Sequence, residues 1–208
     1  MKGLLLKDWY MMKKHYRAYL LIAAAFLGVS MVNPGNLFFI FYPCLLCGMI
    51  PVNLLAYDEH SRWIQYCDTL PCTRAQFVSA KYLTGLLAQL SMLADTGLAQ
   101  GIKMAVTGGF SAGDFTVMML LMFIVATVTP SISLPFVFKL GTEKGRTAYY
   151  VMISFVCGAS AIASGILGER LQTPIRANLP LIFIAIGGIG IYILSWHMSI
   201  RFYQQREL

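Results

Sequence analysis

Residues 57–82, which read YDEHSRWIQYCDTLPCTRAQFVSAKY, form the longest polar stretch of the chain and carry charged, aromatic and cysteine side chains. We call this segment the elbow. It contains no nucleophile and base in a recognisable triad order and no pair of carboxylates spaced for acid–base work. His60, Cys67 and Cys72 would need a fourth ligand to hold zinc, and none lies at a suitable spacing. The residue types therefore predict a contact surface, with no catalytic residue and no metal.

Phosphate-binding motifs are also missing from the sequence. The run from Gly141 to Arg146 (GTEKGR) comes nearest to a P-loop but has the wrong spacing. Five cysteines form no disulfide framework, and the CxxC at Cys44 and Cys47 lies in an apolar run. The basic residues form no nucleic-acid-binding patch. We expect no cofactor bound by this chain and no ATP hydrolysis by it alone.

The composition of the chain indicates what class of protein contains the elbow. Of the 208 residues, 58% are hydrophobic and only 12% are charged, and the mean hydropathy is +0.67. A soluble domain carries about 25% charged residues. The chain is predicted to be an all-α, polytopic membrane protein, and a soluble globular enzyme is excluded.

Six apolar segments are long enough to cross a bilayer, which takes about 20 helical residues. The first stops at the turn sequence Asn33-Pro34-Gly35-Asn36, the fourth should kink or break at Pro130 and Pro135, and the sixth opens with Asn178 and Pro180. The expected spans are 17–33, 37–56, 83–107, 115–138, 147–167 and 179–200. One domain, 1–208, would thus comprise an interfacial helix (1–16), spans one and two (17–56), the elbow, spans three and four (83–138), a loop (139–146), spans five and six (147–200) and a tail (201–208).

Basic residues set the orientation of these spans. All but three of the 16 lysines and arginines fall in the N-terminal segment, the elbow, the 139–146 loop or the tail; the exceptions are Lys103, Arg170 and Arg176. The positive-inside rule therefore places both termini and both longer connections in the cytoplasm.

The N-terminal segment has the pattern of a helix that lies at the membrane surface. Leu5, Trp9, Met12 and Tyr16 share one stripe, whereas Lys7 and Lys14 share another. We expect Lys7, Trp9, Lys13 and Lys14 to contact the headgroup layer. A basic flank that only sets topology is the alternative.

Local signals divide the elbow into two helices. Asp58 and Arg62 are spaced for a helical ion pair, and an apolar face follows at Trp63, Tyr66, Cys67 and Leu70. Pro71 ends this helix, and a capping box from Thr73 to Gln76 starts the next one, which leads into span three. The prediction is a helix, a sharp corner and a second helix that re-enters the membrane.

The elbow also carries a family resemblance. Tyr57-Asp58-Glu59, Trp63, Leu70-Pro71, Thr73-Arg74 and Lys81-Tyr82, set between the second and third of six spans, resemble small ABC-2 type permease subunits of Gram-positive bacteria. The permeases of the phenol-soluble modulin peptide exporter are the most similar in character. Family members often have Ser at the position of Thr73, and Cys67 and Cys72 lie outside the pattern.

The resemblance implies a complex of two permease subunits, identical or different, with two separate ABC ATPase subunits that bind ATP and magnesium. The elbow would be the coupling helix and the 139–146 loop a second contact. The implied coupling residues are Asp58, Glu59, Arg62, Trp63, Tyr66, Leu70, Pro71, Arg74 and Lys144. The implied function is export of an amphipathic or hydrophobic substrate, with amphipathic peptides favoured, across a bacterial cell membrane.

Among the polar residues inside span three, Asp95 and Gln89 are the candidates for a functional role. Asp95 lies at its centre, where a carboxylate costs several kcal/mol unless it is protonated, paired or hydrated, and Gln89 lies on a different face. They could line the substrate pathway or a seam between helices or subunits, and Asp95 could instead be a structural hydrogen bonder or a proton relay. An ion-coupled carrier or channel that uses Asp95, a membrane scaffold and an intramembrane enzyme remain alternative functions.

Overall fold

The computed structural model describes residues 2–32, 38–67, 69, 72–106, 111–147, 149–151, 153–154 and 178–205, and among these every regular element is helical. The helices are α1 (Lys2–Val32), α2 (Phe38–Gly48), α3 (Ile50–His60), α4 (Trp63–Cys67), α5 (Arg74–Val106), α6 (Ala112–Leu140) and α8 (Asn178–Gln205).

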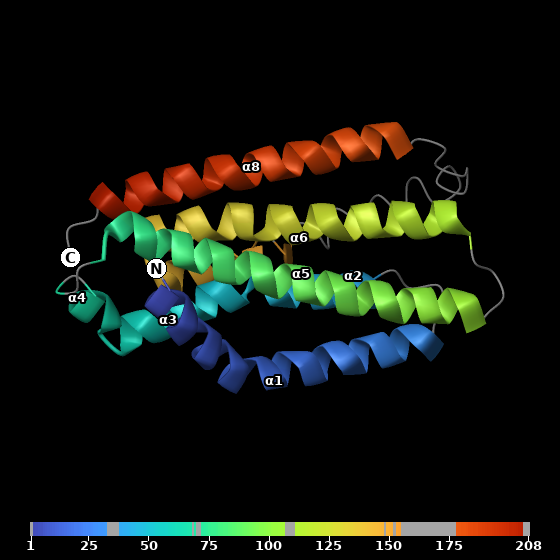
Figure 1. Cartoon of the computed structure of the whole chain (residues 1–208), viewed down its shortest axis with the longest axis horizontal. Helices are drawn as coiled ribbons and strands as arrows, with labels where there is room; N and C mark the ends of the chain where they lie inside the picture. The colour runs from blue at the N-terminus through green and yellow to red at the C-terminus, as the bar shows by residue number, and fades with distance from the viewer. Residues whose placement is uncertain are drawn as a thin grey trace.

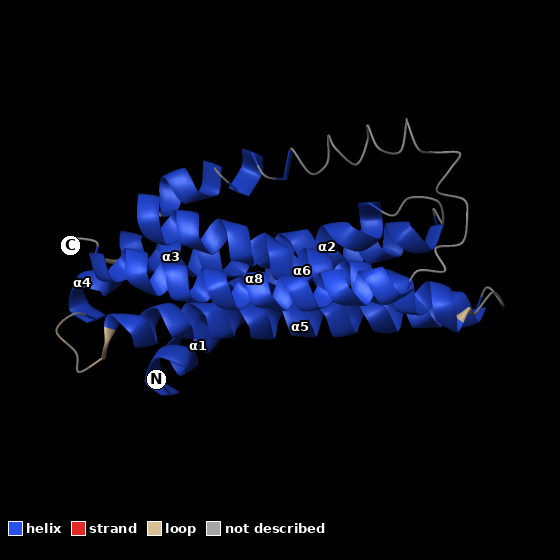
Figure 2. Ribbon diagram, turned by 90° about the horizontal axis from the view of Figure 1, so that it is seen from above, coloured by secondary structure: helices blue, strands red, loops and turns tan. Residues whose placement is uncertain are grey.

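The long helices run side by side as a bundle (Figures 1 and 2). Both termini lie at one end, together with α3 and α4. Four helices within the described residues are long and apolar enough to cross a membrane: Phe41–His60, Arg74–Val106, Phe115–Leu140 and Leu181–Gln205. The predicted all-helical membrane protein is thus confirmed in class. The segment expected at 17–33 lies in α1, and that at 147–167 falls mostly outside the described residues.

Helix α1 joins two elements that the sequence separated. The expected surface helix (1–16) and first span form one helix of 31 residues. Its N-terminal part turns away from the direction of the remainder and crosses the end of the bundle (Figures 1 and 2). The bend brings the first turns of α1 beside the elbow.

The second span is interrupted where α2 gives way to α3. Pro51 follows the interruption and has no N–H to bond the preceding turn. The buried Gln89 amide fits between two backbone groups of α2, donating to the Cys44 carbonyl at 3.2 Å and accepting from the Gly48 N–H at 3.0 Å. A Cβ at Gly48 would lie 2.6 Å from Thr129 Cγ2, so glycine is needed for this approach. Gln89 therefore joins α5 to α2.

Helix α6 continues through Pro130 and Pro135, so of the kink or break expected there, the break does not occur. Pro135 cannot donate to the Ser131 carbonyl one turn earlier, but Ser195 Oγ of α8 donates to it at 2.7 Å. A neighbouring hydroxyl thus replaces the lost backbone bond, which is how membrane helices tolerate proline.

A buried polar network joins α5 to α8 near the end that carries the termini. Tyr82 Oη lies 2.8 Å from Ser195 Oγ and 2.7 Å from Ser199 Oγ, and Tyr192 Oη donates to the Tyr82 carbonyl at 2.8 Å. Trp196 stacks on the Tyr82 ring at 5.6 Å. Hydrogen bonds between helices in a bilayer contribute about 0.6–2 kcal/mol each. This network fixes the register of α5 against α8.

Replacing Tyr82 by Phe should lower the unfolding temperature of the detergent-purified protein by several degrees, because it removes the hydroxyl shared by Ser195 and Ser199. Tyr66→Phe is the matched control, since Tyr66 is 56% exposed. Equal unfolding temperatures for the two variants would show that the network adds nothing to stability.

Candidate functional site

Four charged side chains from three helices meet where the elbow packs against α1. Lys81 Nζ of α5 lies 2.7 Å from Asp8 Oδ1 of α1 and 2.5 Å from Asp58 Oδ2 of α3, the latter as an ion pair rather than an aligned hydrogen bond. Lys7 Nζ of α1 lies 2.5 Å from Asp58 Oδ1 and 3.5 Å from Asp8 Oδ1. We call these four residues the charge cluster.

The charge cluster is formally neutral and almost wholly enclosed. Asp8, Asp58 and Lys81 are each 1% exposed, and the Lys7 side chain is 21% exposed. Buried charges are tolerated when each is paired. If one partner is removed, the other charge remains buried without compensation in a medium of low dielectric constant. The cluster therefore holds α1, α3 and α5 in one arrangement.

The elbow bends twice, and the predicted Asp58–Arg62 helical pair is wrong. Helix α3 ends at His60, and Arg62 has φ 54°, a left-handed conformation that no helix continues. Asp58 faces the charge cluster instead. The sequence missed this break because the i,i+4 spacing cannot reveal that Asp58 has stronger partners on α1 and α5.

Trp63 anchors the short helix α4 to the rest of the chain. Its ring lies 4.5 Å from Lys7 Nζ, a cation–π distance, and it packs against the buried core that includes Ile64 and Cys67. The Tyr66 ring lies beside it with the centroids 5.3 Å apart and the planes tilted by 48°, but Tyr66 is 56% exposed. The face of α4 that was predicted to be apolar is thus partly buried within the chain.

Glu59 links the elbow to the segment after α6. Glu59 Oε2 accepts from the Thr142 backbone N–H at 3.1 Å and from its hydroxyl at 2.5 Å. Arg146 Nη2 donates to Asn53 Oδ1 at 3.3 Å. Gly141, at φ 88°, ends α6 and allows residues 142–147 to start a new helix there. The two segments predicted as separate contacts form one braced unit.

The second corner follows the prediction closely. Thr73 N donates to Gln76 Oε1 and Gln76 N donates to Thr73 Oγ1, both at 3.3 Å, so the capping box is confirmed. Arg74 Nη1 donates to the Gln204 carbonyl of α8 at 3.4 Å, where a cation suits the end of a helix. Leu70 and Pro71, also implied as coupling residues, lie outside the described residues.

Only part of the elbow remains available to another protein. We call the exposed residues between the end of α3 and Tyr66 the docking face; they are His60, Ser61, Arg62, Gln65 and Tyr66. Lys144 is exposed as well. Among the implied coupling residues, Arg62 and Tyr66 therefore point outward, whereas Asp58, Glu59 and Trp63 hold the elbow in place.

The structure divides the residues expected at the membrane surface. Trp9 and Lys13 are exposed, as a headgroup contact requires, and the Lys14 side chain lies outside the described part. Lys7 instead turns into the charge cluster. Asp8 was missed altogether, although a single carboxylate in a basic amphipathic segment was a signal that could have pointed to it.

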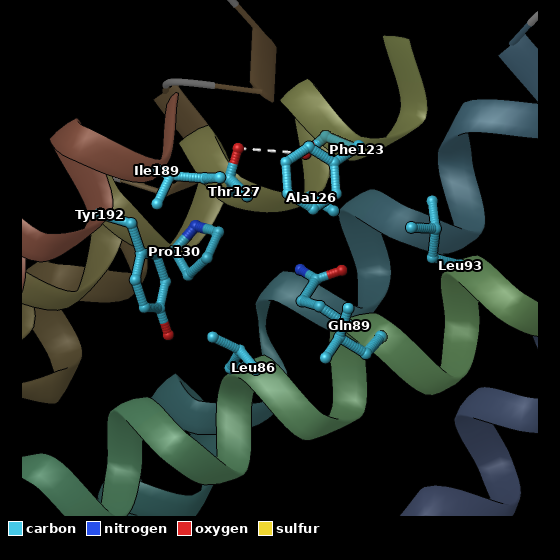
Figure 3. A pocket seen from close by; sticks show the side chains of 10 residues that line it. Leu86, Gln89, Leu93, Phe123, Ala126, Thr127, Pro130, Ile189 and Tyr192 are labelled. Carbon is cyan, nitrogen blue, oxygen red and sulfur yellow. Dashed lines mark hydrogen bonds between the residues drawn. The ribbon is translucent and has the colours of Figure 1, made fainter. Parts of the chain in front are cut away.

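An apolar cavity of about 230 Å³ lies between α5, α6 and α8, and Figure 3 shows their side chains converging on it. Gln89, Thr127 and Tyr192 are the polar residues in its lining. Asp95 does not line this cavity. It lies on the exposed face of α5 with Leu87, Leu98 and Ile102, where lipid or another subunit would meet it.

No group of three metal-ligating side chains occurs within the described residues. In comparisons with known proteins, a family model described as "ABC-2 family transporter protein" matches residues 3–204. No curated protein and no solved structure matches the chain.

Replacing Lys81 by Met should destabilise the protein by about 3–5 kcal/mol, because Asp8 loses its closest cation and the cluster gains a net negative charge. Unfolding temperature and monodispersity in detergent measure this loss. Lys144→Met, at an exposed lysine, is the matched control and should have little effect.

The double variant Asp8→Asn with Lys81→Met leaves the neutral Lys7–Asp58 pair. It should recover most of the stability that Lys81→Met loses. A double variant less stable than Lys81→Met would contradict charge balance as the reason for the effect.

Proposed function

Because the chain belongs to the ABC-2 family of transporter proteins, we propose that it is the membrane-spanning permease subunit of an ATP-binding cassette exporter, driven by a separate ATPase subunit. Two copies of the ATPase would bind ATP and magnesium and would pair with two permease subunits. The end of the bundle that carries both termini would face the cytoplasm, in agreement with the distribution of basic residues.

The observation that carries the proposal is the docking face on its rigid support. Arg62 and Tyr66 project from α4, while Asp58 and Trp63 beneath them are tied to α1 and α5. A partner that pushed on this face would move α5 through Lys81. It would also move α6 through the Glu59–Thr142 bonds, since Thr142 follows α6 directly.

Such an arrangement suits a motor made of another polypeptide. Closure of two nucleotide-binding subunits can do work on membrane helices only through a connection that does not deform. Paired buried charges and a capped helix start are features of a stiff connection. The exposed Lys144, braced to the elbow through its own helical segment, would supply the second contact.

The substrate we propose is amphipathic or hydrophobic, with amphipathic peptides of the phenol-soluble modulin type as the favoured class. The cavity between α5, α6 and α8 supports this choice, because its lining is almost entirely apolar. Gln89 bonds the backbone of α2 and Thr127 donates to the Phe123 carbonyl, so the lining offers a substrate chiefly apolar contact.

The proposed partnership predicts that the ATPase co-purifies with this chain and that the double variant Arg62→Glu with Tyr66→Ala binds it at least tenfold more weakly. Pull-down with the tagged permease and titration by light scattering measure both effects. The matched control is Arg201→Glu with Tyr10→Ala, which alters one exposed arginine and one exposed tyrosine elsewhere. Equal loss in both double variants would count against the docking face.

A second prediction concerns Asp95. Since its carboxylate lies on the exposed face of α5, we expect it to face the second permease subunit or the substrate. Asp95→Asn should leave ATPase binding unchanged and should alter transport in proteoliposomes by severalfold. Unchanged transport in this variant would show that Asp95 has only a structural role. Transport by the permease alone under an ion gradient would favour an ion-coupled carrier.

A further inference from the structure

Two thiols face each other across the second corner of the elbow. Cys67 closes α4 and Cys72 precedes the capping residue of α5. Their Sγ atoms lie 3.1 Å apart, and the Cys72 thiol also donates to the Cys67 carbonyl at 3.2 Å. Cys67 is 5% exposed, whereas Cys72 is half-buried. One sulfur is therefore reachable from solvent and the other is held directly behind it.

This geometry is close to that of a disulfide. An S–S bond is about 2.05 Å long, so the two sulfurs must approach by only about 1 Å. The two thiols belong to residues five positions apart, and their sulfur atoms are already in contact. The bond would join the C-terminal end of α4 to the residue two positions before α5.

We propose that Cys67 and Cys72 are a reversible dithiol that a low-molecular-weight disulfide oxidises. The Cys72 thiolate, having lost its proton to solvent, attacks one sulfur of the oxidant and expels one thiolate. The Cys67 thiol then loses its proton and attacks Cys72 Sγ, forming the protein disulfide and expelling the second thiolate. Two electrons pass to the oxidant, and the two protons convert its halves into two thiols.

The difference in exposure assigns the two roles. Oxidation begins at a thiol that solvent can reach and is completed by a neighbouring thiol that resolves the mixed disulfide. Cytosolic glutathione keeps most such pairs reduced, so a pair on the cytoplasmic side would respond only when the redox balance shifts. The disulfide would close the corner between Tyr66 and Thr73 covalently. Any effect on ATPase coupling rests on the proposed function, but formation of the bond does not.

Peptide mass spectrometry tests the proposal on the full-length protein in membranes. Trypsin cleavage after Arg62 and Arg74 releases residues 63–74, which contain Cys67 and Cys72 and no other cysteine. After reduced glutathione and alkylation, this peptide should carry two alkyl groups. After glutathione disulfide, most of it should carry none and should be two hydrogens lighter, and dithiothreitol should reverse the change.

Cys72→Ser is the matched control, because it removes the reachable thiol and leaves the buried one. Its peptide should carry one alkyl group before and after glutathione disulfide. Two alkyl groups on the wild-type peptide after oxidation, or a stable glutathione adduct at Cys72, would overturn the proposal. Normal dithiol oxidation without any ATPase co-purification would leave the dithiol standing and would count against the proposed function alone.

Discussion

The ammonium group of Lys81 lies between the carboxylates of Asp8 and Asp58, and the arrangement of the elbow depends on it. These two carboxylates belong to helices far apart in the sequence, and neither could be enclosed without a cation beside it. Lys7 completes the balance and lies over Trp63, so the same cluster that orders α1, α3 and α5 also positions α4. Hydrophobic packing alone would allow these helices to slide, whereas four paired charges permit one arrangement.

The residues that carry the resemblance to ABC-2 permeases fall into two groups, according to whether they hold the elbow in place or face outward. Asp58, Trp63 and Lys81 lie inside the chain and hold the elbow together, and Tyr82 continues the support by bonding α8. Arg62 and Tyr66 lie outside. The motif to which the proposed function assigns a partner contact thus consists largely of residues that support the docking face from within the chain. The support matters because a contact surface can pass movement on to the membrane helices only if it is rigidly connected to them.

The membrane imposes a second constraint, which the bundle meets with side chains. A backbone group left unpaired in hydrocarbon is costly, and proline removes a donor wherever it occurs in a helix. Ser195 donates to the carbonyl that Pro135 leaves free, and Gln89 bonds both sides of a turn in α2. These polar residues lie at the contacts between spans, so they also specify which helices are neighbours.

Composition and hydropathy determined the class of the protein and the helical spans that the described residues include, and a local motif determined the capping box at Thr73 and Gln76. Each of these depends on chemistry within a few residues, which a sequence displays directly. Tertiary structure alone decided that Asp58 pairs with Lys81 and not with Arg62. It also decided that Lys7 points into the charge cluster and that Glu59 bonds Thr142. Those outcomes depend on which charges from distant helices meet in a space without water. A pair spaced i,i+4 on a helix contributes a few tenths of a kcal/mol, and a buried charge left without its partner costs about ten times as much.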